Sequence, residues 1–133
     1  MTLLVSATAI ELPANPAAFD VFRMRQDTAY SSQTSRGTVT LEVRPAWKDG
    51  GLEVHISANT HSVDLSTLDL KDLARLVVGD TALSPESAGA LSGHHAETKL
   101  LFPLEERPES FAIEIRDVPD VPLRVLKWPE AGL

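Results

Sequence analysis

The sequence contains no cysteine, and this excludes disulfides, cysteine-ligated zinc, iron–sulfur clusters and thiol nucleophiles. It also lacks a long hydrophobic run, since about 18 consecutive apolar residues are needed to cross a bilayer as a helix. We therefore expect no membrane insertion. Lysine and arginine total 12 against 19 acidic residues, which gives a formal net charge of −7. Because nucleic-acid binding relies on clustered basic residues, we expect no nucleic-acid partner.

The first residues do not have the pattern of a signal peptide. No lysine or arginine precedes the apolar stretch 3–10, which is short and interrupted by serine and threonine. The sequence as written predicts a cytoplasmic location, and the lack of cysteine is compatible with a reducing compartment. An extracytoplasmic location stays open as the alternative, because a leader could have been removed.

The strongest local pattern is an alternation of apolar and polar residues. It runs through residues 38–44 and again through 52–59, with the turn sequence Lys-Asp-Gly-Gly at 48–51 between them. Apolar side chains at every second position indicate a strand with one buried face, and glycine supplies the positive φ of a tight turn. These residues predict an antiparallel hairpin.

Similar short segments follow along the rest of the chain. Further strands are predicted at 75–78, 81–83, 98–102, 110–116 and 123–128. Leucine spacing favours a short helical turn at 66–73, while 84–93 and 117–122 are predicted to be loops. Short strands at intervals of about ten residues predict an all-β, immunoglobulin-like two-sheet sandwich of about seven strands with one short helical insertion.

The N-terminal part has a different pattern. We predict an N-terminal arm or edge segment at residues 1–36 and the sandwich domain at 37–133. Within the arm, residues 3–12 suit an edge strand and Asn15 suits a helix N-cap before a proline. Residues 26–37 are polar and rich in serine and threonine, which predicts a mobile connection.

Three histidines lie beside predicted strand ends. His61 follows one strand, and His94 and His95 precede another, with Asp64 close to the first of them. Imidazole nitrogen is a good ligand for zinc or copper, and strand ends at one pole of a sandwich meet in space. One hypothesis is a zinc or copper site made by these four residues. The other is that the histidines only hydrogen-bond and hold two loops together.

A further hypothesis is a hydrolase whose Ser–His–Asp triad would consist of Ser62 or Ser92, His94 or His95, and Asp64. The chain has no G-x-S-x-G nucleophile elbow and no phosphate-binding glycine motif. We therefore expect a protein that is not an enzyme and needs no cofactor beyond the hypothetical metal.

Several short motifs together resemble a known family. They are Thr-His-Ser-Val-Asp-Leu at 60–65, Gly-His-His at 93–95, and Ile-Arg-Asp-Val at 115–118 followed by Trp128. In this order they resemble a family of small, uncharacterised bacterial and archaeal β-sandwich domains, across residues 37–128. The resemblance implies a sandwich fold and members that are commonly exported or lipid-anchored, and it implies no activity.

These observations lead to one expectation and one alternative. We expect a non-enzymatic binding or structural β-sandwich module whose partner is another protein or a second copy of the chain. The alternative is a domain that binds zinc or copper through His61, His94, His95 and Asp64.

Overall fold

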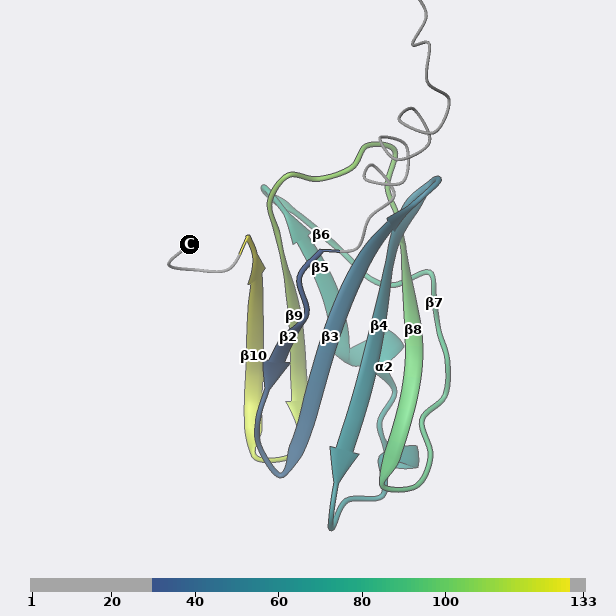
Figure 1. Cartoon of the computed structure of the whole chain (residues 1–133), viewed down its shortest axis with the longest axis vertical. Helices are drawn as coiled ribbons and strands as arrows, with labels where there is room; N and C mark the ends of the chain where they lie inside the picture. Colours follow the sequence, from purple (N-terminus) through teal and green to yellow (C-terminus); the bar gives the residue numbers. More distant parts are fainter. Residues whose placement is uncertain (1–29, 130–133) are drawn as a thin grey trace, which may run out of the picture.

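The computed structural model describes residues 30–129, so the predicted edge strand at 3–12 and helix start at Asn15 lie outside the described residues. Two antiparallel sheets pack face to face (Figure 1). One has five strands in the order β2-β3-β4-β8-β7, and the other has four in the order β10-β9-β5-β6. Among the described residues the strands are β2 (Gln33–Ser35), β3 (Val39–Lys48), β4 (Gly51–Thr60), β5 (Ala74–Val78), β6 (Thr81–Leu83), β7 (Ser87–Ala88), β8 (His95–Pro103), β9 (Phe111–Val118) and β10 (Val121–Trp128).

The β3–β4 hairpin confirms the alternation found in the sequence. Val39 pairs with Thr60 at one end and Lys48 with Gly51 at the other. Gly50 turns the chain with a φ of +89°, a region that residues with a Cβ rarely adopt. The hairpin thus forms at the residues where both the turn sequence and the apolar alternation predict it.

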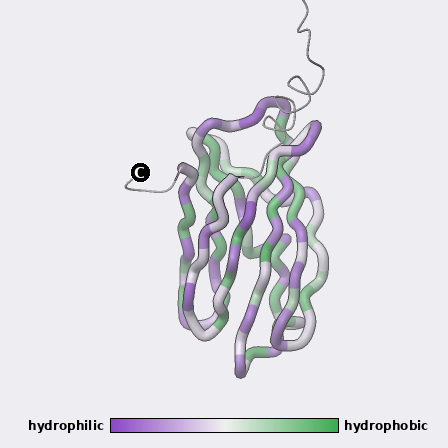
Figure 2. The backbone as a smooth tube through the Cα atoms, in the orientation of Figure 1, coloured by the Kyte–Doolittle hydropathy of each residue, from purple (hydrophilic) through white to green (hydrophobic). Residues whose placement is uncertain are grey.

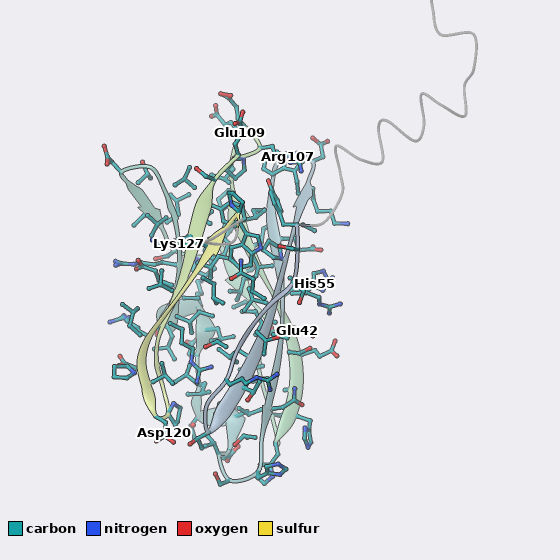
Figure 3. All side chains as sticks on the ribbon, turned by 60° about the vertical axis from the view of Figure 1, so that its left-hand side comes forward. Glu42, His55, Arg107, Glu109, Asp120 and Lys127 are labelled. Carbon is teal, nitrogen blue, oxygen red and sulfur yellow. The ribbon has the colours of Figure 1, made fainter. Side chains whose placement is uncertain are left out.

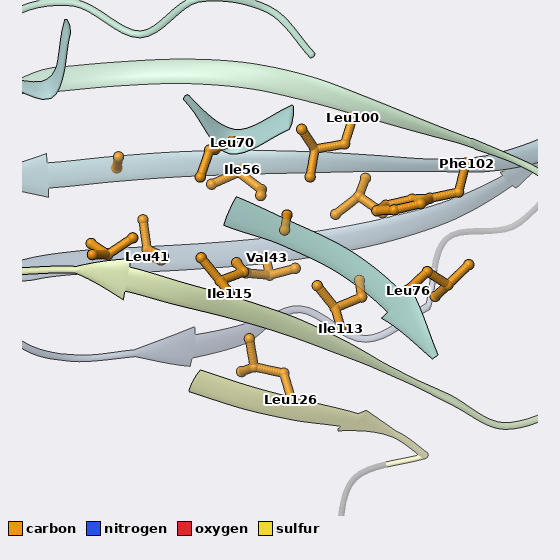
Figure 4. Packing of buried hydrophobic residues seen from close by; sticks show 14 of the residues in the cluster. Leu41, Val43, Ile56, Leu70, Leu76, Leu100, Phe102, Ile113, Ile115 and Leu126 are labelled. Atoms are coloured by element: carbon orange, nitrogen blue, oxygen red, sulfur yellow. The ribbon is translucent and has the colours of Figure 1, made fainter. Parts of the chain in front are cut away.

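The two sheets enclose one core, and the two-sheet all-β sandwich is confirmed. Apolar side chains of both sheets interdigitate between the layers (Figure 4). Hydropathy alternates along the strands, because successive side chains point to opposite faces (Figure 2). Among the residues fully buried in this layer are Leu41, Val43, Ile56, Leu100 and Phe102 from the five-stranded sheet, and Leu76, Ile113 and Ile115 from the other.

The predicted helical insertion is present as two short pieces, η1 (Leu65–Thr67) and α2 (Leu70–Leu73). An aspartate caps each piece: Asp64 accepts a hydrogen bond from the backbone of Ser66, and Asp69 accepts one from Lys71. The residues between the pieces are extended, so the caps divide the segment into two turns. No helix among residues 30–129 has the length and hydropathy needed to cross a membrane.

Three sequence predictions need correction. The predicted loop 84–93 contains β7, the predicted mobile connection 26–37 contains β2, and the loop 117–122 shortens to a turn between Val118 and Val121. Strands of two or three residues are too short to show a period, and they form here because each pairs with a longer neighbour. The described residues therefore hold nine strands instead of about seven, and the first of these begins at Gln33.

The short strand β2 also contacts the opposite sheet at one side of the sandwich. Ser31 accepts a hydrogen bond from the indole nitrogen of Trp128, and Gln33 donates one to the carbonyl of Lys127. Ser35 accepts one from Arg124. Residues 31–35 therefore run beside β10 and close the gap between the two sheets.

Candidate functional site

The histidine-bearing segments meet at one end of the sandwich. Since β4 and β8 are antiparallel neighbours, the end of β4 lies beside the start of β8. The amide of Thr60 donates to the carbonyl of His94 at 2.9 Å, and the amide of Leu65 donates to that of Gly93 at 3.0 Å. Gly93 has a φ of +69°, which lets the chain bend there. The expected meeting of the two segments thus takes place through backbone hydrogen bonds.

The side chains at this end are held by local partners. The Nδ1 of His95 lies 2.7 Å from the Oδ1 of Asn59, its register partner on β4. The carboxylate of Asp64 accepts hydrogen bonds from the hydroxyl of Ser66 at 2.7 Å and from its amide at 3.0 Å. The Ser66 hydroxyl, then its amide, lower the pKa of Asp64, and the charge of His94 lowers it further.

This arrangement gives the metal hypothesis no preformed ligand set. Within residues 30–129, no three histidine, aspartate or glutamate side chains group so that they could hold a metal ion. A zinc site needs its ligand atoms to converge on one centre. The zinc or copper site at His61, Asp64, His94 and His95 stays a prediction that only experiment tests.

The hydrolase residues do not form a triad in the described part of the chain. Asp64 is bonded to Ser66 and the imidazole of His95 to Asn59. The amide of Ser62 donates to the hydroxyl of Thr60. The nucleophile, base and orienting carboxylate of such an enzyme must be linked by hydrogen bonds, and the structure places this aspartate in a helical cap instead.

A second candidate lies on the solvent side of the four-stranded sheet, here called the outer face. Leu123 and Val125 of β10 are 51% and 45% exposed, and they are the exposed large hydrophobic residues within 30–129. Leu123 pairs with Arg116 on β9, and Val125 pairs with Glu114. Glu114 also pairs with Arg75 on β5. The aliphatic side chains on β10 are therefore followed across the sheet by charged side chains on β9 and β5.

The outer face is hollowed beside these residues. A depression of about 360 Å³ is lined by Leu73 and Leu123 together with Arg75, Glu114 and Arg116. Inside it, the Nε of Arg75 donates to Glu114 at 2.8 Å. Arg116 donates to the backbone carbonyl of Asp72 at 3.2 Å and has no carboxylate partner among the described residues. The guanidinium of Arg75 is therefore paired with a carboxylate, and that of Arg116 is available for one.

A second depression of about 340 Å³ lies at the other end of the same sheet. It is lined by Val77, Phe111, Ala112, Lys127 and Trp128, among others. The ring of Phe111 stacks on that of Trp128 with centroids 5.3 Å apart. Because Trp128 is buried, it closes the core there and does not face a ligand. The outer face thus has hollows at both ends.

The solvent side of the five-stranded sheet has a different chemistry. Glu42 and His55 lie on this side (Figure 3), and the register places Arg44, His55 and Lys99 next to one another. His55 donates to Glu53 at 3.0 Å. His55 is partly exposed on this polar face of β4. Charged side chains dominate this face, and among the described residues it presents no exposed large hydrophobic residue.

The sequence analysis did not identify the outer face as a candidate site. Its signal was present in β10, where Leu123 and Val125 flank Arg124. Alternation alone does not say which of these residues point inward. Pairing with β9 decides it, because the register places Leu126 opposite Ile113, so that Leu126 and Arg124 lie inside.

Comparison with known proteins gives no relative from which a role could be taken. No family model matches the chain, and no curated protein and no solved structure is similar to it. The resemblance to a β-sandwich family with Thr-His-Ser-Val-Asp-Leu and Gly-His-His motifs therefore stays a prediction.

Proposed function

We propose that the chain is a non-enzymatic binding module with an immunoglobulin-like sandwich, and that it binds a protein through the outer face of its four-stranded sheet. The strand order supports the immunoglobulin-like part. Immunoglobulin domains pair strands A-B-E-D in one sheet and C-F-G in the other, with a C′ strand added in variable-type domains. The order β3-β4-β8-β7 corresponds to the first sheet and β6-β5-β9-β10 to the second, with β2 as an added edge strand.

The observation that carries the proposal is the exposure of Leu123 and Val125 side by side on β10. Single exposed aliphatic residues are common, but adjacent ones rimmed by polar groups mark interaction surfaces. Here the polar groups are Arg116 and Glu114 on β9 and Arg75 on β5, which lie beside the aliphatic pair toward the middle of the sheet. Apolar side chains next to polar ones are usual in a protein interface.

The shape of the outer face favours a protein over a small molecule. Ligand pockets for small molecules are deep and bury most of the ligand, with a mainly apolar lining. The depression next to Leu123 instead has charged walls, formed by Arg75, Glu114 and Arg116. Such a surface is suited to side chains that project from another protein.

The proposal is tested by quantitative affinity capture from extracts of the cells that produce the protein. The bait is the full chain, compared with the double variant Leu123→Ser/Val125→Ser. A matched control, Leu101→Ser, removes a leucine from the other sheet, where Leu101 is only half buried. We expect a protein that is captured by the wild type and the control and lost by the double variant.

Circular dichroism and thermal melting establish that each bait is folded. The proposal is overturned if the folded wild type enriches no protein and also does not bind a second copy of itself. It is also overturned if the enriched proteins are captured equally by the double variant.

A further inference from the structure

We propose that the outer face binds a second copy of this chain, so that two four-stranded sheets pack face to face about a twofold axis. This inference rests on the proposed function and names its partner. The surface that carries it consists of two neighbouring rows of side chains. One row is Leu123 and Arg116, and the other is Val125, Glu114 and Arg75.

The two rows are complementary to each other. Both have an aliphatic residue on β10, and on β9 one has the cation Arg116 where the other has the anion Glu114. An isologous interface uses the same patch on both subunits, so such a patch must be complementary to itself. On β10 and β9 the rows carry aliphatic residues side by side and opposite charges side by side, and this arrangement meets the condition.

A twofold axis that lies in the contact plane and crosses the strands between the rows brings each row onto the other row of the second copy. Arg116 then faces Glu114 of the partner subunit, and Leu123 faces Val125 of the partner subunit. The guanidinium of Arg116 thereby gains the carboxylate that it lacks among residues 30–129 of its own chain. Each contact occurs twice in the dimer.

The local charge allows two acidic chains to meet at this face. The whole chain has a net charge of −7, which by itself makes copies repel. Around the depression, the two arginines Arg75 and Arg116 balance the two acids Asp72 and Glu114. The outer face is therefore locally neutral, unlike the molecule as a whole.

The expected affinity is modest, because the contact is confined to one side of a small sheet. Interfaces below the standard size of about 800 Å² per partner are weak or transient, so we expect a dissociation constant of about 1 µM or weaker. Sedimentation velocity of the full chain from about 5 µM to about 1 mM tests for such a dimer. A wild type that stays monomeric at the highest concentration overturns the inference.

The decisive experiment exchanges charges between the rows. In Glu114→Arg both rows carry only cations on β9, and in Arg116→Glu both carry only anions. Like charges then face each other twice, so each variant alone should dimerise at least about tenfold more weakly than the wild type. An equimolar mixture of the two variants restores opposite charges at both contacts, and we expect it to form a mixed dimer.

A matched variant on the other sheet, Glu97→Arg, controls for the change in net charge and should dimerise like the wild type. Circular dichroism confirms that each variant is folded, and Arg116→Glu changes an exposed side chain. The inference is overturned if the mixture stays monomeric while the wild type dimerises. It is also overturned if the single variants dimerise as the wild type does.

These results are separable from those of affinity capture. If the chain is monomeric at every concentration and yet captures another protein only when Leu123 and Val125 are intact, the proposed function stands, and the second copy is not the partner. If the chain neither dimerises nor captures another protein, the outer face is rejected as a binding surface.

Discussion

Asn59 on β4 and His95 on β8 are opposite each other in the sheet, and the Oδ1 of Asn59 lies 2.7 Å from the Nδ1 of His95. An amide oxygen only accepts hydrogen bonds, so Nδ1 of His95 carries the proton. This pair joins the end of β4 to the start of β8 next to the two loops.

We expect Asn59→Ala to lower the free energy of unfolding by less than about 1 kcal/mol, which is the range of an exposed cross-strand pair. Urea unfolding of this variant, His95→Ala and the double variant gives the coupling energy between the two side chains. A coupling energy of zero would contradict the hydrogen bond. Nitrogen NMR of His95 independently reports whether Nδ1 is the protonated atom.

Zinc or copper should leave the melting temperature of protein purified without a histidine tag unchanged. The reason is that His95 and Asp64 are engaged with Asn59 and Ser66, and no three ligands converge within residues 30–129. A ligand that binds only the folded state must raise the melting temperature. Stoichiometric metal with a raised melting temperature, both lost in His94→Ala, would establish the metal site instead.

The stabilisation that the Asp64 cap gives the folded protein should be lost in acid. Hydrogen bonds from Ser66 hold the pKa of this carboxyl below its ordinary value of 3.8. The ionised form thus stabilises the fold fully above 3.8, and this contribution is lost as the pH falls through the lower value in the folded protein. Carbon NMR of the carboxyl should show Ser66→Ala raising the pKa toward 3.8, while the control Ser62→Ala leaves it unchanged. Equal pKa values in all three proteins would refute this role of Ser66.

Arg124 is a buried cation whose replacement should stabilise the protein. The residue is 3% exposed, and within the described part of the chain it makes one hydrogen bond, to Ser35, and has no partner for Nε or its second amino group. Burial lowers the pKa of Arg124, because it disfavours the charged form. We expect Arg124→Met, which keeps the length of the side chain, to raise the free energy of unfolding by about 1 kcal/mol or more.

Urea unfolding measures this change, and the exposed Arg36→Met serves as a control that should have no effect. A loss of stability in Arg124→Met would mean that the guanidinium is better satisfied than its contacts indicate.

The sequence predicted the long strands because one physical signal dominates them. Val39, Leu41 and Val43 alternate with polar residues, and only a strand with one buried face accommodates that period. The edge strands β2 and β7 have three and two residues, too few to carry a period, and they exist through pairing with the longer strands β3 and β8.

The same limit applies to the candidate sites. The meeting of His61 and His94 at one end of the molecule follows from antiparallel strands and was predictable. The partners of individual side chains depend on rotamers and register, so the engagement of Asp64 by Ser66 was not. On β10, an inward Arg124 between outward Leu123 and Val125 reverses the usual relation between hydropathy and burial.

The contact between residues 31–35 and β10 has a consequence for the integrity of the protein in solution. An eight-residue edge strand with aliphatic side chains is a template on which other chains can add strands and grow into fibres. Hydrogen bonds from Gln33 to Lys127 and from Trp128 to Ser31 shield this edge. We therefore expect proteolytic removal of the chain up to Ser35 to expose this edge and to promote aggregation.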